Sequence, residues 1–370
     1  MSQAQSIGAA AEDRIAVASN WKLVWWRFRR HHLALFSAGL LIFMYLIVLC
    51  PEFFSTQDPQ RTDARQAFIP VQPLHFFDNG WNPWVPGIIG KRNPVTLRME
   101  WTTDPNRKVH VGFFSPGTSY RAFGLFETNI HLIGAVDPGQ RIFLLGSDRL
   151  GRDQWSRIMR GTQTSMTVGL VAVALSVILG VVLGGISGYF GGLPDLIIQR
   201  LIELLQSVPT IPIWLALSAA LPRDWTPVQV FFAITVILSL VGWTTLGREV
   251  RGRFLALREE DFVLAARLAG CGRMRIILRH MVPTFLSHII ATSSLAIPVM
   301  IINETSLSFL GLGIRPPAIS WGVLLQEAQN IQTLALAPWL LIPGLVVIIA
   351  VLAFNLVGDG LRDASDPYSH

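Results

Sequence analysis

The sequence predicts an all-α polytopic membrane protein with about six transmembrane helices and a small β-rich insertion outside the membrane. Hydrophobic residues make up 51% of the 370 positions and charged residues only 15%, whereas soluble domains carry about 25% charged residues. The mean hydropathy is +0.46. Several apolar runs are long enough to cross a hydrocarbon core, which takes about 20 residues in a helix. The predicted spans are 33–50, 163–190, 196–221, 228–247, 284–306 and 338–358.

Lysine and arginine are distributed unevenly between the loops that these spans define. Four basic residues stand directly before the first span, and eight arginines lie between the fourth and fifth spans. In contrast, Arg223 is the basic residue between the third and fourth spans, and Arg315 is the one between the fifth and sixth. Because short cytoplasmic loops are enriched in Lys and Arg, we expect both termini and the segment 248–283 in the cytoplasm. The long segment 51–162 then lies outside, since long loops cross largely regardless of their charge.

The N-terminal region predicts a membrane anchor that is retained. Residues 1–20 lack the apolar core of a cleavable signal sequence, and the first span is too long to be one. In the stretch NWKLVWWRFRRHH, Trp21, Trp25 and Phe28 share one helical face. Residues 1–32 are therefore expected to contain a short helix in the membrane interface, with its rings toward lipid. A basic flank with an aromatic belt explains the pattern almost equally well.

The segment 51–145 differs abruptly from its surroundings, because it is rich in Pro, Trp and Phe. Apolar and polar residues alternate in VTLRMEW (95–101), and the apolar residues of KVHVGFF (108–114) share one face. An alternation with period two predicts half-buried strands. We therefore expect a small β-rich unit outside the membrane.

Few ionisable groups lie within the predicted spans, and this narrows the possible energy sources. A charged residue inside a span costs about 2.5–3.5 kcal/mol on insertion scales and usually marks an ion or proton path. Glu304 is the carboxylate near the outer end of a span, and no chain of similar residues accompanies it, as a carrier driven by protons or sodium would need. The phosphate-binding motif G-x-x-x-x-G-K-[ST] is also absent from the sequence. Energy for transport is therefore expected from ATP bound to another polypeptide, through a contact surface.

The basic stretch DFVLAARLAGCGRMRIILRHMVP, residues 261–283, stands between two strongly apolar runs. Acidic residues at its start and Arg267 further along suit a helix macrodipole, and Gly270 is a natural helix stop. A second short helix is expected over 273–281, with Pro283 opening the fifth span. Small alanines keep the first helix thin, so that the groove of a partner can approach its backbone. A docked rigid helix and a solvated loop explain this spacing equally well.

Five stretches of the chain, taken together, resemble one family. AARLAGCGRMRIILRHMVP is similar to the coupling loop of ABC-importer permeases, whose pattern is Glu-Ala-Ala, three residues, Gly and a run that ends in Leu-Pro. The chain resembles more narrowly the C-type inner-membrane permease subunit of dipeptide and oligopeptide ABC importers. The further stretches are WRFRRHHLALFSAGLL, LLGSDRLGRDQWSRIMRGTQTSMTVG, NETSLSFLGLG and NLVGDGLRDASDP. The resemblance covers nearly everything except residues 1–20 and most of the external segment.

The resemblance implies the fold of a type I ABC importer permease. Residues 146–370 would form a core of five transmembrane helices, with 248–283 as its cytoplasmic coupling loop and 51–145 as a periplasmic insertion. It also implies a heteromeric complex in the bacterial inner membrane, with a paralogous permease subunit, two cytoplasmic ATP-binding subunits and a periplasmic solute-binding protein. The chain would form half of the path for peptides without catalysing a reaction. It would bind no cofactor, because ATP and Mg²⁺ belong to the partner subunits.

The resemblance further implies which residues couple this chain to the ATP-binding subunit. They are Asp261, Leu264, Ala265, Ala266, Arg267 and Gly270. Leu264 stands where the pattern of the family has an acidic residue, so a charge contact there is absent or comes from Asp261. Val282 replaces the usual leucine before the proline, which is a mild change.

Two polar groups near the outer side allow both a functional and a structural interpretation. Asn303 and Glu304 could line the translocation path or an outer gate, but with Ser306 and Ser308 nearby an internal hydrogen-bonded cluster explains them at least as well. A dense charged turn precedes the second span and consists of Asp148, Arg149, Arg152, Asp153 and Arg157. For this turn, mutual pairing on a solvated entrance helix is favoured over direct contact with a substrate.

Alternatives remain for the cargo and for the class of function. Related importers also carry oligosaccharides, opines or nickel, so the same transporter type with another solute is the nearest alternative. GISG, residues 185–188, matches the Gly-x-Ser-Gly of intramembrane serine proteases, with Ser187 as nucleophile and His288 as base. A secondary carrier is the third possibility. Four residues in a glycine-rich span match easily by chance, and the sequence favours a permease.

Overall fold

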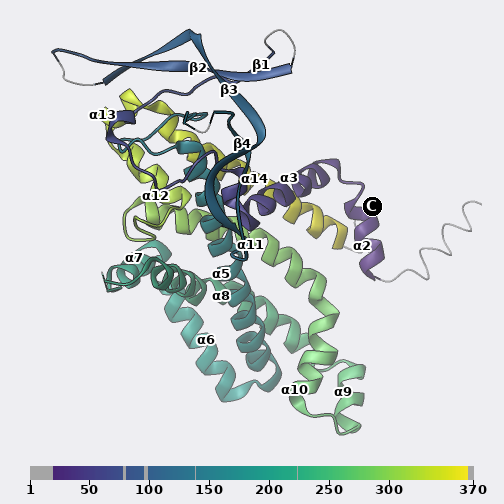
Figure 1. Cartoon of the computed structure of the whole chain (residues 1–370). Helices are drawn as coiled ribbons and strands as arrows, with labels where there is room; N and C mark the ends of the chain where they lie inside the picture. The colour runs from purple at the N-terminus through teal and green to yellow at the C-terminus, as the bar shows by residue number, and fades with distance from the viewer. Residues whose placement is uncertain (1–19, 78–80, 96–98, 138, 223, 366–370) are drawn as a thin grey trace, which may run out of the picture.

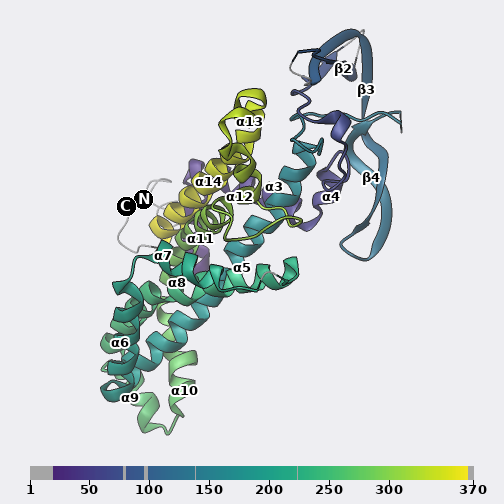
Figure 2. The ribbon, with the colours of Figure 1, turned by 90° about the vertical axis from the view of Figure 1, so that its left-hand side faces the viewer.

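The computed structural model describes residues 20–77, 81–95, 99–137, 139–222 and 224–365. A helical bundle carries a β-sheet at one end and two short helices, α9 and α10, at the opposite end (Figure 1, Figure 2). The helices are α2 (Asn20–Phe28), α3 (His32–Leu49), α4 (Pro51–Phe54), α5 (Gln154–Phe190), α6 (Gly192–Ser207), α7 (Thr210–Ala219), α8 (Pro227–Leu257), α9 (Asp261–Leu268), α10 (Arg273–Arg275), α11 (Leu286–Phe309), α12 (Trp321–Gln326), α13 (Ile331–Leu336) and α14 (Ile342–Ser365). Shorter helical turns are η1 (Ala64–Gln66), η2 (Ile276–Met281), η3 (Val282–Phe285), η4 (Glu327–Gln329) and η5 (Pro338–Leu341).

Several of the described helices are long and apolar enough to cross a membrane. The five stretches that meet this condition are His32–Leu49, Gln154–Phe190, Pro227–Leu257, Arg273–Phe309 and Pro338–Ala364. Each of them contains or matches one predicted span, so the prediction of a mostly helical multi-pass membrane protein is confirmed. The helices extend beyond the predicted apolar cores because polar residues at their ends continue the same helical turns.

The predicted third span, 196–221, is wrong as a single straight helix. Its residues form α6 and α7, which are bent by 89° relative to each other. The break falls at Val208, whose backbone is extended with φ −99° and ψ 136°. The ring of Pro209 causes this, because it disfavours the helical conformation in the residue before it. If the bent pair counts as one broken span, the described part of the chain has six spans.

The N-terminal helix α2 packs against the end of α14. Phe28 is 5% exposed and lies in a small apolar cluster with Ala34 and Ala364. The prediction that its ring faces lipid is therefore wrong, whereas the Trp25 ring is 55% exposed. The predicted position of the Trp21 side chain lies outside what the structure describes. This contact brings the two ends of the described chain together, next to the end of α3 that is remote from the sheet (Figure 1).

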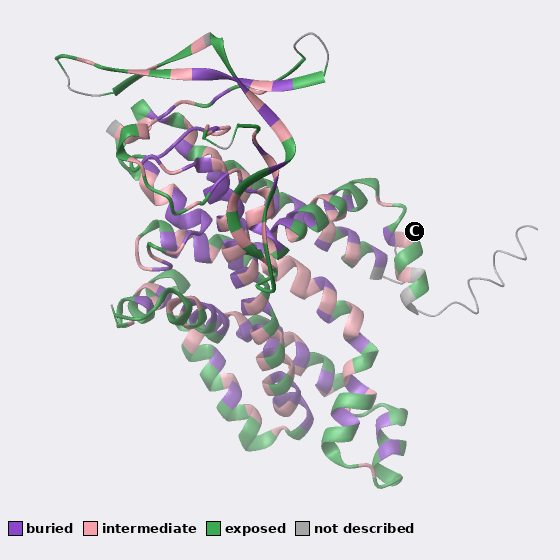
Figure 3. Ribbon diagram, in the orientation of Figure 1, coloured by how far each residue is buried: buried purple, intermediate pink, exposed green. Residues whose placement is uncertain are grey.

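The insertion contains a four-stranded antiparallel sheet in the order β1-β2-β3-β4. The strands are β1 (His75–Phe77), β2 (Trp81–Arg92), β3 (Met99–Ala122) and β4 (Phe126–Ala135). The predicted strand 108–114 lies inside β3, and of the predicted strand 95–101 the last three residues begin β3. Positions 96–98 lie outside the described residues. The sheet buries only a small cluster around Val85, and much of its surface is exposed (Figure 3). Together with α4, η1 and long loops, it makes the insertion mixed in structure.

Close contact between α5 and α8 gives the bundle its central support. A Cβ atom at Gly184 would lie 2.4 Å from the carbonyl oxygen of Gly247, and one at Gly188 would lie 2.7 Å from that of Arg251. Small residues let helix backbones in a membrane approach this closely. Farther toward the sheet, buried Leu238 on α8 belongs to the apolar cluster that also includes residues of α5 and α11. The helix α5 is thus supported along its length.

Candidate functional site

The predicted coupling segment begins with α9, whose inner face is fixed to the chain's own core. Val263 and Ala266 are 0% and 8% exposed, and they belong to an apolar cluster with Val250, Phe254 and Ile277. Ala266 was predicted to contact another subunit, but its side chain faces inward. Its packing holds α9 on the bundle and so determines which face of the helix remains open.

The outer face of α9 is apolar although it is exposed. Phe262 and Leu264 are each 40% exposed, and Leu268 is 91% exposed. Apart from Ala266, all residues that were predicted to couple the chain to a partner are on the surface: Asp261, Leu264, Ala265, Arg267 and Gly270. The structure therefore brings all of these except Ala266 to one open end of the bundle, remote from the sheet (Figure 1).

The end of α9 has the geometry that the sequence predicts. Gly270 has φ +74°, a conformation that costs other residues roughly 1–2 kcal/mol. The N–H of Gly270 donates to the carbonyl of Arg267 at 3.0 Å, and the N–H of Cys271 donates to that of Ala266 at 3.1 Å. These bonds satisfy carbonyl groups at the end of the helix. The turns of α10, η2 and η3 follow, and the helical stretch Arg273–Phe309 continues through Pro283.

Two arginines fasten this segment to the end of α5. The guanidinium carbon of Arg267 lies 5.1 Å from the ring centre of Tyr189, and that of Arg273 lies 5.4 Å from the ring centre of Phe190. Cation–π contacts of this kind contribute about 0.5–1 kcal/mol at exposed sites. Sequence reasoning missed them, although an aromatic pair at the end of a span next to an arginine-rich loop is a recognisable signal. As a result, a force on α9 acts directly on α5.

The residues of the protease alternative do not form a catalytic pair. Ser187 is fully buried and its hydroxyl donates to the carboxylate of Asp195. Asp195 also accepts two hydrogen bonds from the guanidinium of Arg251, at 2.6 and 2.7 Å. His288 lies 3.3 Å from Glu249 instead. Ser187 therefore belongs to a polar joint between α5, α6 and α8.

Glu304 is the centre of a buried polar cluster toward the sheet end of the bundle. It is fully buried, and its carboxylate accepts hydrogen bonds from Ser165 at 2.8 Å and from Ser308 at 2.7 Å. Ser165 in turn accepts from the backbone N–H of Trp321 at 3.1 Å. This is the internal cluster that the sequence offered as an alternative to a gate, and it connects α5, α11 and α12. Asn303 is only half-buried, and its predicted part in the path stays a prediction.

Three residues of the charged turn before α5, Asp148, Arg152 and Arg157, are paired as predicted, whereas Arg149 is exposed. Asp148 and Arg157 are 0% and 1% exposed, and their side chains form an ion pair. Arg152 contacts Asp148 at 2.6 Å and Glu327 at 2.7 Å, while Arg157 contacts Glu327 at 3.0 Å. The network thus connects the loop before α5 with η4, far along the chain. Sequence reasoning did not identify Glu327 as a partner.

Two family descriptions match this chain. Residues 176–368 match the binding-protein-dependent transport system inner membrane component, and residues 19–71 match the N-terminal TM domain of oligopeptide transport permease C. The first match contains the coupling segment, Glu304, α8 and the part of α5 that includes Gly184 and Gly188. The second contains α2, α3 and α4.

Individual proteins show the same relationship. The oligopeptide transport system permease protein OppC of Bacillus subtilis (strain 168) is 35% identical over 260 residues, which are 70% of this chain and 81% of that protein. OppC of Haemophilus influenzae is 36% identical over 242 residues, 65% of this chain and 75% of that protein. Among solved structures, an inward-facing MetNI methionine ABC transporter matches with a TM-score of 0.44 and 17% identity, over 57% of this chain and 97% of that chain. The family match and the extent of the identity to both permeases lead to one conclusion: the chain belongs to the binding-protein-dependent transport system inner membrane component family and is a permease subunit of an ABC transporter.

Proposed function

We propose that the chain forms half of the translocation path of an ATP-driven peptide importer in the bacterial inner membrane. In this proposal both termini and α9 lie in the cytoplasm, and the sheet lies in the periplasm. The partners are a paralogous permease, two cytoplasmic ATP-binding subunits and a periplasmic solute-binding protein. ATP and Mg²⁺ bind to the partner subunits, in agreement with the absence of a phosphate-binding motif from this sequence.

The open apolar face of α9 is the observation that carries this proposal. An exposed leucine such as Leu268, 91% exposed, becomes favourable when a partner covers it, by about 1.5–3 kcal/mol. The inner face of α9 is held by the chain's own core, so the helix meets a partner as a rigid body. Its connection to α5 through Tyr189 and Phe190 gives movement of that partner a direct route into the bundle.

Peptides are the proposed cargo because the relatives that match most of this chain are named as oligopeptide or peptide permeases. Importers of oligosaccharides, opines or nickel are the alternatives. Co-purification of the chain with its partners, followed by identification of the ligand on the solute-binding protein, distinguishes them. Uptake of a peptide by the complex in proteoliposomes, dependent on ATP, is the expected result. Uptake by the purified chain alone would contradict the proposal.

Replacing Gly270 with leucine is expected to uncouple ATP hydrolysis from uptake. A leucine strains the left-handed backbone at φ +74° by roughly 1–2 kcal/mol, so the end of α9 shifts while the membrane helices stay intact. We expect peptide uptake to fall about tenfold or more in proteoliposomes, while ATP is still hydrolysed. Gly252→Leu is the control, because a Cβ atom there meets nothing within 4 Å and no positive φ is recorded for it. Equal loss of uptake in both variants would contradict the role of Gly270.

Replacing Leu268 with serine is expected to weaken binding of the ATP-binding subunit. Loss of a buried leucine contact worth about 1.5–3 kcal/mol corresponds to a dissociation constant that is roughly 10- to 100-fold larger. This dissociation constant is measured by titrating the purified ATP-binding subunit onto the chain and its paralogous permease in nanodiscs. Leu125→Ser, at a side chain 76% exposed near the sheet, serves as the control and should leave binding unchanged. If the Leu268 variant bound the ATP-binding subunit with unchanged affinity, Leu268 on α9 would not be part of the contact.

A further inference from the structure

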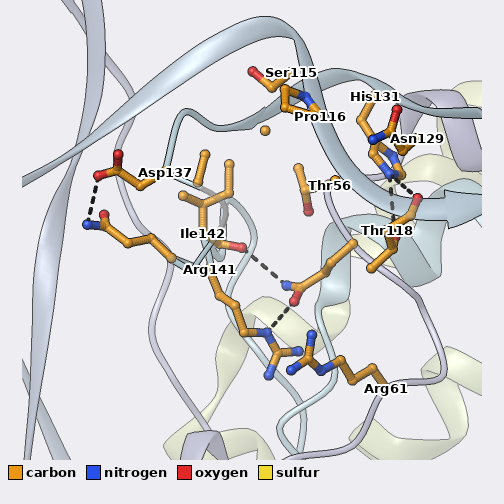
Figure 4. Close-up of a pocket in the computed structure, with 15 residues that line it drawn as sticks. Thr56, Arg61, Ser115, Pro116, Thr118, Asn129, His131, Asp137, Arg141 and Ile142 are labelled. Carbon is orange, nitrogen blue, oxygen red and sulfur yellow. Dashed lines mark hydrogen bonds between the residues drawn. The ribbon is translucent and has the colours of Figure 1, made fainter.

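A polar cavity lies between the sheet and the loops that join it to the bundle. Its volume is about 330 Å³, within the range of cavities that bind small molecules. Residues 115–118 of β3 and 129–135 of β4 form one side, and the loop 56–61, Asp137 and residues 140–142 form the other (Figure 4). The predicted functions of the bundle make no use of this cavity.

Two arginines face each other at one end of the cavity. Arg61 and Arg141 both line the cavity, and the charge of Arg61 acts on the Arg141 guanidinium (Figure 4). The Arg141 side chain is 13% exposed and forms an ion pair with Asp63 at 3.7 Å. Burial lowers the pKa of Arg141, and the neighbouring charge of Arg61 lowers it further. Two like charges held together in a partly buried site favour an anion between them.

One nitrogen of the Arg141 guanidinium has no hydrogen-bond partner among the described residues and is covered by protein, so an anion reaches it only when the side chain turns into the cavity. Its Nε donates to the side-chain oxygen of Gln57 at 2.5 Å, and its Nη1 donates to the side-chain oxygen of Gln66. The remaining Nη2 is buried and makes no hydrogen bond to any described residue. A buried guanidinium N–H without a partner costs free energy, and an oxyanion that accepts from it recovers a charge-assisted hydrogen bond.

The far end of the cavity carries the opposite charge. Asp137 lies there, away from the arginine pair (Figure 4), and its carboxylate accepts a hydrogen bond from Gln140 at 3.1 Å. A multiply charged anion would be repelled by this carboxylate. A zwitterion, with a carboxylate at one end and an ammonium group at the other, matches both ends.

Two further cavities lie between this one and the helical bundle. It shares Gln57, Thr118 and His131 with a second cavity of about 230 Å³. That cavity shares Gln60 and Arg160 with a third, of about 450 Å³, between α5, α8 and the loop before α12. His131 belongs to the wall between the first two cavities. Its ring nitrogens lie 2.8 Å from the carbonyl of Glu52 and 3.0 Å from that of Thr118, and these contacts hold the ring in place. Three neighbouring cavities, separated by side chains that they share, thus lie between the sheet and the helices α5 and α8.

We propose that the cavity beneath the sheet binds a zwitterionic peptide. The carboxylate of the peptide lies between Arg61 and Arg141, and its ammonium group lies near Asp137. This inference rests on the proposed function in so far as the ligand is the transported solute. It adds a solute site in the permease chain itself, outside the membrane helices.

The test is direct binding of tri-alanine and of tri-alanine amide to the full chain in nanodiscs, measured by calorimetry. The amide lacks the negative carboxylate, so we expect it to bind about tenfold more weakly or worse. Arg61→Gln and Arg141→Gln should each weaken binding of tri-alanine about tenfold, while leaving that of the amide nearly unchanged. Arg121→Gln is the matched control, because this arginine of the sheet is 72% exposed and pairs with Glu127 outside the cavity.

Three outcomes would overturn the inference: no binding of tri-alanine, equal binding of the amide, or an equal effect of Arg121→Gln. Arg61 is exposed, so its variant tests the site even if Arg141→Gln fails to fold. Uptake by the assembled importer is measured separately. Uptake of peptide without binding at this cavity rejects the site and leaves the proposed function standing, whereas failure of the full complex to import peptides rejects the proposed function itself.

Discussion

Replacing Asp148 with alanine is expected to destabilise the folded chain by about 3–5 kcal/mol, as the loss of one partner from a buried ion pair usually does. The carboxylate is completely buried and pairs with Arg152 and Arg157. It also accepts from the backbone N–H groups of Leu150 and Arg152, at 2.8 and 3.0 Å. Alanine leaves the buried guanidinium of Arg157 with Glu327 as its remaining carboxylate, and it releases the loop that leads into α5.

Thermal and denaturant unfolding of the purified chain in detergent measures this effect. Glu203→Ala is the matched control, because Glu203 also pairs with an arginine, at 2.6 Å, but the two side chains are 73% and 51% exposed. An exposed pair contributes about 0–1 kcal/mol, so this variant should unfold almost like the parent chain. Similar midpoints for both variants would show that the buried network does not stabilise the fold.

Replacing Gly184 with isoleucine is expected to separate α5 from α8. The Cβ atom alone would lie 2.4 Å from the carbonyl oxygen of Gly247 and 3.0 Å from Cβ of Val250. Backbone cannot move aside as the end of a flexible side chain can, so the helices must shift apart. Overpacking costs about 1–3 kcal/mol where neighbours adjust, and a clash with backbone belongs at the upper end of this range.

We expect a strongly reduced yield of folded protein from Gly184→Ile, with a lower unfolding temperature for the fraction that survives. Size-exclusion chromatography and thermal unfolding measure the two effects. Gly39→Ile, in α3, is the control: it introduces the same side chain into a helix, and its Cβ atom meets nothing within 4 Å. A loss of folded protein that is equal in the two variants would mean that glycine content, and not the contact between α5 and α8, is what matters.

Much of the helical fold follows from local sequence. Long apolar runs predict the membrane helices because the hydrocarbon core sets a minimum length. The end of α9 at Gly270 was predictable, since few other residues adopt its backbone conformation. The bend before α7 was also within reach, because Pro209 marks it. Hydropathy alone passes over this signal, since Val208 and Pro209 stand between two apolar stretches.

Other features depend on contacts between distant residues and could not be derived from one sequence. Glu327 stands far from Asp148 and Arg157 in the chain, and no local pattern pairs them. Likewise, spacing placed Ala265 and Ala266 together as small residues, but only the packing against Phe254 decides which of the two faces inward. The arginines of the cavity lie in the chain before β1 and after β4, and no local pattern joins residues so far apart.

The uninterrupted helix α5 extends from the contact with α9 to the opposite end of the bundle. It has 37 residues, about 55 Å at the rise of an α-helix. It crosses α8 most closely at Gly184 and Gly188. This crossing lies near the end that Arg267 and Arg273 contact, so the part of α5 that extends toward Arg160 is the longer part. A tilt of about 6° around this crossing would displace Arg160, about 36 Å away along the helix, by roughly 4 Å. A small tilt of α5 beside α9 would therefore become a larger displacement at the opposite end, beside the cavity that Arg160 lines.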